Sequence, residues 1–260
     1  MRVSLSRCRV PARILTVCFF FCTWAIGPDV SQPIAKAADV PVELELVLLA
    51  DSSSSIRGLE FDLQITGYAQ AFRSEEVIAA IKALGGGGLA VTFVQWSASF
   101  QQVDTVPWMQ VRSRTDSLRF GDAIARQARR FQGFGTATGS ALKHGLKLIT
   151  ENQFTGRRLV MDLTSDEHSN QGPHPKSLRD EIVAQGVTIN GLAILDDNFE
   201  LEGYFRRYVT GGPGSFVLAV DSYDDFADAI VQKLVREISD DPLAGHGAPT
   251  IQHAARGWGR

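Results

Sequence analysis

The feature that most constrains the fold is a regular alternation of short apolar runs with longer amphipathic segments, which begins near residue 42. Residues 43–50 first alternate and then become continuously apolar, as a strand does when it enters a buried sheet. Further runs of this kind predict strands at 89–96, 102–108, 158–163, 187–195 and 216–220. Helical periodicity separates them, at 59–84, 115–131, 139–152, 177–184, 201–208 and 224–238.

Strands that alternate with helices pair in parallel, because the helical crossover returns each strand in the same direction. The pattern therefore predicts one α/β domain over 40–239, with a doubly wound, mostly parallel, Rossmann-like sheet and helices on both faces. Residues 102–108 can pair with 89–96 as an antiparallel hairpin at one edge of this sheet.

The ends of the chain carry a different composition. A basic stretch up to Arg13, an apolar run over 14–27 and the small residues at 35–38 predict a signal peptide over 1–38. The apolar run is short for a bilayer span, so we expect a periplasmic or secreted protein without stable membrane insertion; an uncleaved anchor is the alternative. Residues 240–260 are rich in Gly, Ala, Pro and His without periodicity and are predicted to be disordered.

Cysteine usage and charge exclude several kinds of chemistry. The three cysteines lie at 8, 18 and 22, so a cleaved protein has no disulfide, thiol nucleophile or zinc–thiolate site. The net charge is −3, and the first 37 residues contribute +4 of it, which leaves −7 for the remainder. An acidic body argues against nucleic acid as a partner, since phosphate binding needs a basic face.

Polar side chains are concentrated where predicted strands end, and ligands of open parallel sheets bind beyond those carboxyl ends. The first strand runs into 51–55 (DSSSS), a later one into 164–167 (TSDE), and Gly135 and Thr136 precede a helix. These groups are carboxylate and hydroxyl oxygens, which suit Mg²⁺ best, with Mn²⁺ or Ca²⁺ as alternatives, and suit zinc or copper poorly.

This set of residues resembles the metal-ion-dependent adhesion site of von Willebrand factor A (vWA) domains. The likeness extends in order over about 42–239: D-x-S-x-S at 51–55, Gly135-Thr136 before the segment 139–142, and Asp166 after 158–163. The string from Arg157 to Gly172 further resembles a family of exported bacterial vWA-like proteins of unknown function.

The resemblance implies a set of metal ligands. Ser53, Ser55 and Thr136 would supply hydroxyls, and Asp51 and Asp166 would bind the ion directly or through water. Two positions depart from the family's pattern. Glu167 replaces the glycine that usually follows the last aspartate, and Ser165 replaces the usual threonine before it.

Each motif also has a simpler interpretation. Asp51 with its serines, and Thr136, can serve only as helix caps, and Asp166 can be an ordinary turn carboxylate. Asp162, inside a strand, is interpreted as a structural residue near the site. His168 and His174 are interpreted as solvated loop residues.

The resemblance implies a binding module, in which the cation coordinates an Asp or Glu carboxylate of a protein partner. The alternative is a metal-assisted hydrolase or phosphoryl-transfer enzyme that uses the same oxygens. The sequence has no G-x-S-x-G elbow for a serine nucleophile. Ser53 stands where an aspartyl-phosphate enzyme would carry its second carboxylate, and no general base is placed. We therefore expect binding and not catalysis.

Overall fold

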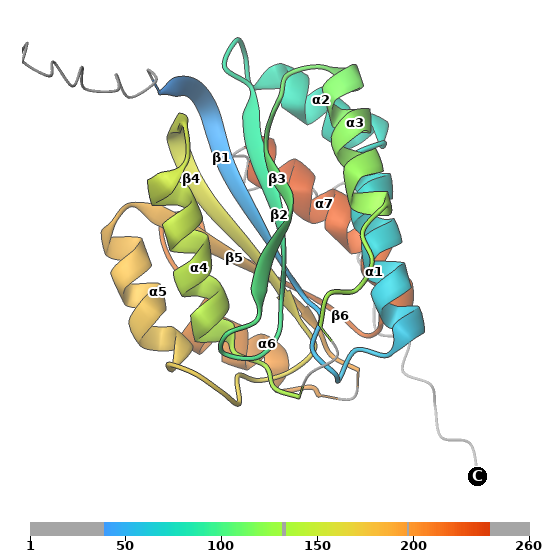
Figure 1. The fold of residues 1–260 in the computed structure, drawn as a ribbon, viewed down its shortest axis with the longest axis vertical. Helices are drawn as coiled ribbons and strands as arrows, with labels where there is room; N and C mark the ends of the chain where they lie inside the picture. Colours follow the sequence, from blue (N-terminus) through green and yellow to red (C-terminus); the bar gives the residue numbers. More distant parts are fainter. Residues whose placement is uncertain (1–38, 132–133, 197, 240–260) are drawn as a thin grey trace, which may run out of the picture. The chain divides into compact units, whose positions relative to one another are not determined.

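The fold was analysed in a computed structural model that describes residues 39–131, 134–196 and 198–239. Its centre is a six-stranded sheet in the order β3-β2-β1-β4-β5-β6, in which only the β2–β3 pair is antiparallel (Figure 1). The predicted doubly wound sheet with an edge hairpin is therefore confirmed. The strands are β1 (Val40–Asp51), β2 (Leu89–Trp96), β3 (Gln102–Val111), β4 (Phe154–Ser165), β5 (Val187–Ile194) and β6 (Val217–Val220).

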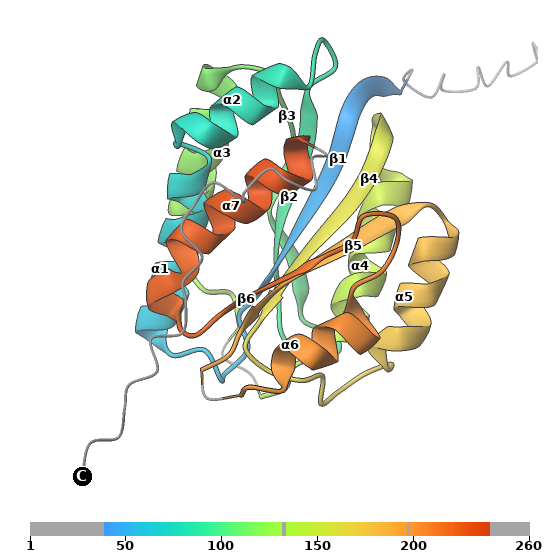
Figure 2. The same ribbon diagram turned by 180° about the vertical axis from the view of Figure 1, so that it is seen from behind.

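Helices cover both faces of the sheet, as Figures 1 and 2 show from opposite sides. One face carries α1 (Gly58–Ala71), α2 (Glu75–Ala83), α3 (Arg114–Ala125) and α7 (Phe226–Ser239). The other carries α4 (Thr138–Glu151), α5 (Pro175–Ala184) and α6 (Leu201–Tyr204), which continues into a π-helical turn, Phe205–Val209.

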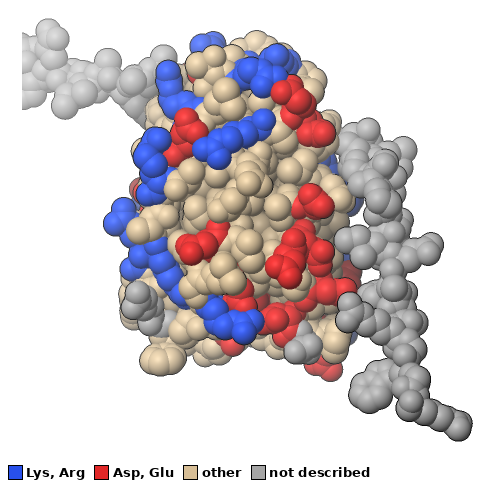
Figure 3. Space-filling view, turned by 90° about the vertical axis from the view of Figure 1, so that its right-hand side faces the viewer, with Lys and Arg blue, Asp and Glu red and all other residues tan. Residues whose placement is uncertain are grey.

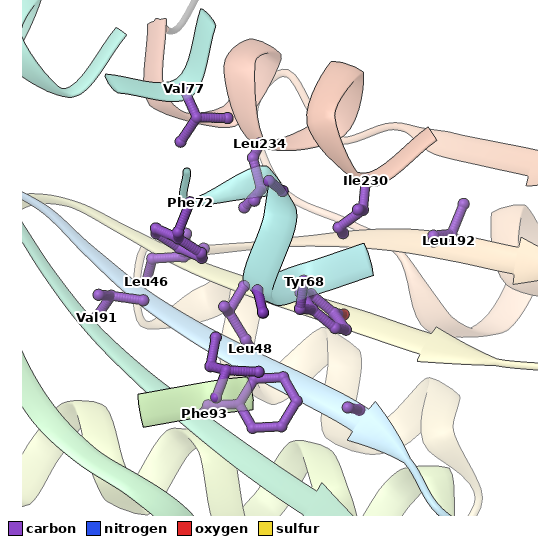
Figure 4. Packing of buried hydrophobic residues seen from close by; sticks show 14 of the residues in the cluster. Leu46, Leu48, Tyr68, Phe72, Val77, Val91, Phe93, Leu192, Ile230 and Leu234 are labelled. Atoms are coloured by element: carbon purple, nitrogen blue, oxygen red, sulfur yellow. The ribbon is translucent and has the colours of Figure 1, made fainter. Parts of the chain in front are cut away.

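The alternation of side chains along β1 explains why a hydrophobic core lies on each face of the sheet. Leu44, Leu46 and Leu48 point to the α1–α7 face, where they pack with aromatic and aliphatic side chains of both helices (Figure 4). Val47 and Leu49, on the alternate positions, belong to the core under α4 and α5. Since successive strand residues face opposite sides, a continuously apolar strand is what a sheet covered on both faces requires.

Three helix predictions differ from the structure. The expected helix at 59–84 is two helices, because Ser74 caps a new one by accepting the Val77 N–H at 3.2 Å. The expected helix at 115–131 ends at Ala125, and Gln95 of β2 then fixes the chain through the backbone of Ala128 and Arg130. The expected helix at 201–208 is α6 followed by the π-helical turn.

The signal-peptide and tail expectations fall on 1–38 and 240–260, outside the described residues. Within the part of the chain that the structure describes, no helix is both long enough and apolar enough to cross a membrane.

A buried ionic cluster joins α7 to the middle of the sheet. Lys233 pairs with Asp162 of β4 and, at 2.6 Å, with Glu237, and all three are almost completely buried. Asn190 of β5 also donates to Glu237, at 3.0 Å. Asp162 is thus structural, as expected, but its partners come from α7. Burial and then the Asp162 charge raise the pKa of Glu237 to about 8, against the opposing effect of Lys233.

This raised pKa predicts a pH-dependent stability. Folded Glu237 holds its proton far above the usual pKa of 4.5, so its contribution to stability is complete below pH 4.5 and is lost as pH rises toward 8. We expect Glu237→Gln to flatten the fall in the free energy of unfolding between pH 5 and 8, measured by urea denaturation. Glu151→Gln, on the exposed side of α4, serves as the control. Equal slopes in wild type and Glu237→Gln would contradict the assignment.

Candidate metal centre

The order of the strands brings the polar motifs to one point. The chain moves outward from β1 to β2 and β3 and then returns to form β4 on the other side of β1, so the winding direction reverses between β1 and β4. Ala50 of β1 is in register with Thr164 of β4. Asp51 and Ser165, the next residues, therefore end neighbouring strands at the position where doubly wound sheets bind ligands.

Asp51 is fully buried at this point and accepts two hydrogen bonds. Its Oδ1 accepts the Ser53 backbone N–H at 2.7 Å, and its Oδ2 accepts the Ser165 hydroxyl. Burial raises the pKa of Asp51 to about 6, although both hydrogen bonds oppose the shift. The carboxylate is held rigidly, but it lacks the charge compensation that ionisation in a buried position requires.

A chain of hydroxyls leads from this loop to the second aspartate. The Ser53 and Ser55 hydroxyl oxygens are 3.0 Å apart, and Ser55 donates to Asp166 Oδ1 at 2.8 Å. Burial raises the pKa of Asp166 to about 8, and the negative charges of Asp51 and Glu167 add to the shift. The three residues thus line one small polar region with Asp51 on its inner side.

Thr136 enters the same network through Glu167. Its Oγ1 donates to Glu167 Oε2 at 2.9 Å, and its backbone N–H donates to the Asn170 side chain at 2.8 Å. The preceding Gly135 has φ +122°, a backbone conformation that residues with a Cβ rarely adopt and that glycine allows. The structure brings all five predicted residues together, and it also adds Glu167 and Ser165.

The two loop histidines make other contacts. The His168 ring packs on Tyr204, with ring centroids 4.3 Å apart, and His174 Nδ1 accepts the Lys176 N–H at the start of α5. Neither histidine therefore adds a nitrogen to the candidate ligands, which remain oxygen atoms.

Arg129, which the sequence analysis did not single out, holds the serine loop in place. Its guanidinium donates to the carbonyl oxygens of Ser52, Ser53 and Ile56, the last at 2.7 Å, and also to that of Phe131. The Arg129 guanidinium therefore binds backbone carbonyl oxygens and not the carboxylates of Asp51 or Asp166. Its sequence signal was weak, because a lone arginine after a helix has no characteristic spacing.

The electrostatics of the cluster fit a cation. Asp51 and Asp166 are buried, and within the described ranges no lysine or arginine pairs with either. Nor do the described residues include three or more His, Cys, Asp or Glu placed to hold a metal by themselves. A metal here would depend on the hydroxyls of Ser53, Ser55 and Thr136, as the donor set of an oxygen-binding cation allows.

The family described as "Protein of unknown function (DUF1194)" matches residues 41–242. The chain belongs to this family. The match spans all six strands and seven helices of the described domain, including every residue of the DUF1194 protein's candidate metal centre. A search of curated proteins finds no match.

Solved vWA structures share the fold of this DUF1194 protein. Proximal thread matrix protein 1 from the mussel byssus, solved with a zinc-occupied MIDAS motif, aligns at TM-score 0.55 and 20% identity over 77% of this chain. The alignment covers 49% of the mussel protein, so the chain spans about half its length.

Two bacterial structures are matched over nearly their whole length. The vWF domain of the type V pili tip protein Mfa5 from Porphyromonas gingivalis aligns at TM-score 0.52 and 12% identity, over 76% of this chain and 96% of that one. BatB from Bacteroides thetaiotaomicron aligns at 0.52 and 13%, over 76% and 100%. At these identities the comparisons establish the vWA fold.

The contacts of Arg129 predict that it positions the loop of candidate metal ligands without itself being a ligand. We expect Arg129→Lys to lower Mg²⁺ affinity about ten- to a hundredfold in calorimetric titration, as the loss of a residue that orients ligands does. Arg130→Lys is the matched control, since Arg130 is the exposed neighbour. Equal Mg²⁺ affinity in Arg129→Lys and wild type would show that the loop holds its shape by other means.

Proposed function

We propose that this protein is an exported vWA module that binds a divalent cation at Asp51, Ser53, Ser55, Thr136 and Asp166 and uses it to hold a protein partner. One observation carries the proposal. Two carboxylates are buried in one cluster with hydroxyl oxygens, and within the described residues no positive charge from a lysine or arginine compensates either of them; burial raises the pKa of both. A bound cation supplies that charge and lowers both pKa values.

Mg²⁺ is the ion that this donor set favours, with Mn²⁺ and Ca²⁺ as alternatives. Small hard cations prefer oxygen ligands, and Mg²⁺ commonly retains waters that an outside oxygen can replace. Hydroxyl ligands are neutral, so the ion keeps much of its charge for a ligand from solution. A carboxylate is the side chain that best satisfies such an ion, and we therefore assign the partner an essential Asp or Glu.

The surface around the site supports a protein as the partner. The four most exposed large apolar side chains of the described residues are Leu59, Phe100, Phe134 and Phe199, each at least 73% exposed. Phe100 and Phe199 follow the carboxyl ends of β2 and β5, Leu59 lies in the first turn of α1 shortly after the serine loop, and Phe134 precedes Gly135 and Thr136. Exposed aromatic side chains around a polar centre are typical of protein interfaces.

The charges on the surface agree with the earlier argument against nucleic acid. On the face seen in Figure 3, acidic and basic side chains are both present, and several of them lie next to one another. A nucleic-acid footprint would require a continuous basic stripe there.

Export is the remaining part of the proposal. It rests on the basic, apolar and small residues of the first 38 positions. N-terminal sequencing of the native protein checks it, since export with cleavage gives a chain that begins near Ala38 or Asp39, whereas an intact N-terminus in the membrane fraction would contradict it.

A pair of neighbouring serines tests the metal ligands. Ser53→Ala removes a buried hydroxyl that contacts Ser55, and we expect it to weaken Mg²⁺ or Mn²⁺ binding at least about tenfold and to reduce the rise in Tm that the metal produces. Ser54→Ala, one residue away and exposed, should bind as wild type does. Equal metal affinity of the two variants would place the site elsewhere.

Substitution of Glu167 tests the coordination position that we propose is open to the partner's carboxylate. Its carboxylate already reaches Thr136 Oγ1, so we propose that it competes with the partner's carboxylate for the ion. Peptides selected from a display library with Mg²⁺ present should carry an essential Asp or Glu and should be released by chelator. Glu167→Gln should bind them more tightly, and Glu200→Gln, in an exposed loop at the same end, should not. Chelator-resistant binding, or no gain in Glu167→Gln, would contradict the competition.

A further inference from the structure

A second concave site lies at the opposite edge of the sheet from the candidate metal. The cavity has a volume of about 280 Å³ and is bounded by the first residues of β4, the start of β5, the segment before β6 and the end of α7. Three arginines line it, Arg157, Arg158 and Arg236.

The three arginines make different contacts. Arg158 donates to the Glu237 and Ile238 carbonyl oxygens, at 2.9 and 2.7 Å, and so fixes the end of α7 as one wall. The Arg236 guanidinium stacks on Phe216, 3.8 Å from the ring centroid, and within the described residues no carboxylate pairs with it. Arg157 is 80% exposed and has only a 3.5 Å contact with Glu43. Two guanidinium groups are therefore available to a ligand.

The rest of the lining combines a polar floor with apolar walls. Asn190 is buried; it donates one side-chain N–H to Glu237, and its Oδ1 accepts the Phe216 N–H at 3.1 Å, so its second N–H has no acceptor among the described residues. Val160 and Pro213 supply hydrocarbon surface, whereas the side chain of Leu159 packs on the opposite face of the sheet. The cavity is larger than an inorganic anion needs, and an inorganic anion would make no favourable contact with its apolar walls.

We propose that this cavity binds a small organic acid, whose carboxylates pair with Arg236 and Arg157 while its carbon skeleton lies against Val160 and Pro213. The stacking of Arg236 on Phe216 holds its planar donor edge in a fixed orientation, as bidentate carboxylate recognition requires. The proposal is independent of the metal, because no residue of the cavity belongs to the candidate metal centre.

Succinate is the probe and inorganic phosphate its matched dianion without a carbon skeleton. In metal-free buffer, calorimetric titration of the full chain should give saturable succinate binding with a Kd of about 1 mM or tighter, and weaker binding of phosphate. Arg236→Gln should weaken succinate binding at least about tenfold, because a charge-assisted hydrogen bond is lost. Arg157→Gln, at an exposed position that does not support the fold, should weaken it as well.

Two control variants separate this site from other surfaces. Arg206→Gln removes an exposed arginine elsewhere, and Ser53→Ala alters the candidate metal centre; both should bind succinate as wild type does. Absence of saturable succinate binding would overturn the proposal, as would unchanged binding in both Arg236→Gln and Arg157→Gln. Phosphate binding as tight as that of succinate would overturn the assignment of an organic acid.

Discussion

The position of β1 between β2 and β4 is the constraint on which the rest of the structure depends. Each residue of its second half is in register with a neighbour on both sides, from Leu44 beside Leu89 and Arg158 to Ala50 beside Gln95 and Thr164. A shift of one residue would exchange the two cores, since side chains alternate between faces. The register that buries both cores is the same one that ends β1 and β4 together, with Asp51 next to Ser165.

Two carboxylate clusters on β4 show why a cation from solution is needed at only one of them. Asp162, in the middle of the strand, has Lys233 as an internal counter-ion, although both are fully buried. Asp166, four residues later, has only hydroxyl donors and a second carboxylate, Asp51, nearby. The fold thus supplies one cluster with a positive charge of its own, and within the described residues it supplies none to the other. This contrast, more than the motif, supports the proposed metal.

The fold and the candidate residues followed from the sequence because both are local patterns. The apolar period predicted the order of strands and helices. The placement of Asp51 and Asp166 beside strand ends, and of Thr136 before a helix, predicted that the topology would bring them together. Other features depend on contacts distant in sequence and could not be predicted. Arg129 reaches a loop more than 70 residues away. The break before α2 is local, since Ser74 caps the helix through Val77 three residues later, but the apolar period continues through it.

Contacts between charged side chains could not be predicted from the sequence either. Lys233, alone in an amphipathic helix, gave no sign that it would meet Asp162, which is 71 residues earlier in the chain. Likewise, the arginines at 157 and 236 become neighbours of one cavity only after β4 and α7 are packed. Periodicity reports which face of an element is buried, and it carries no information on which polar side chains meet across the interface.

The central claim is that the oxygens gathered at the end of β1 hold a divalent cation, and anomalous diffraction tests it most directly. Crystals grown or soaked with Mn²⁺, measured near the manganese absorption edge, should show an anomalous peak within coordination distance, about 2.0–2.4 Å, of the Ser53, Ser55 and Thr136 hydroxyl oxygens. Asp51 and Asp166 should bind the ion directly or through water. A fully soaked crystal without a peak at this position, or with its peak elsewhere, would contradict the account.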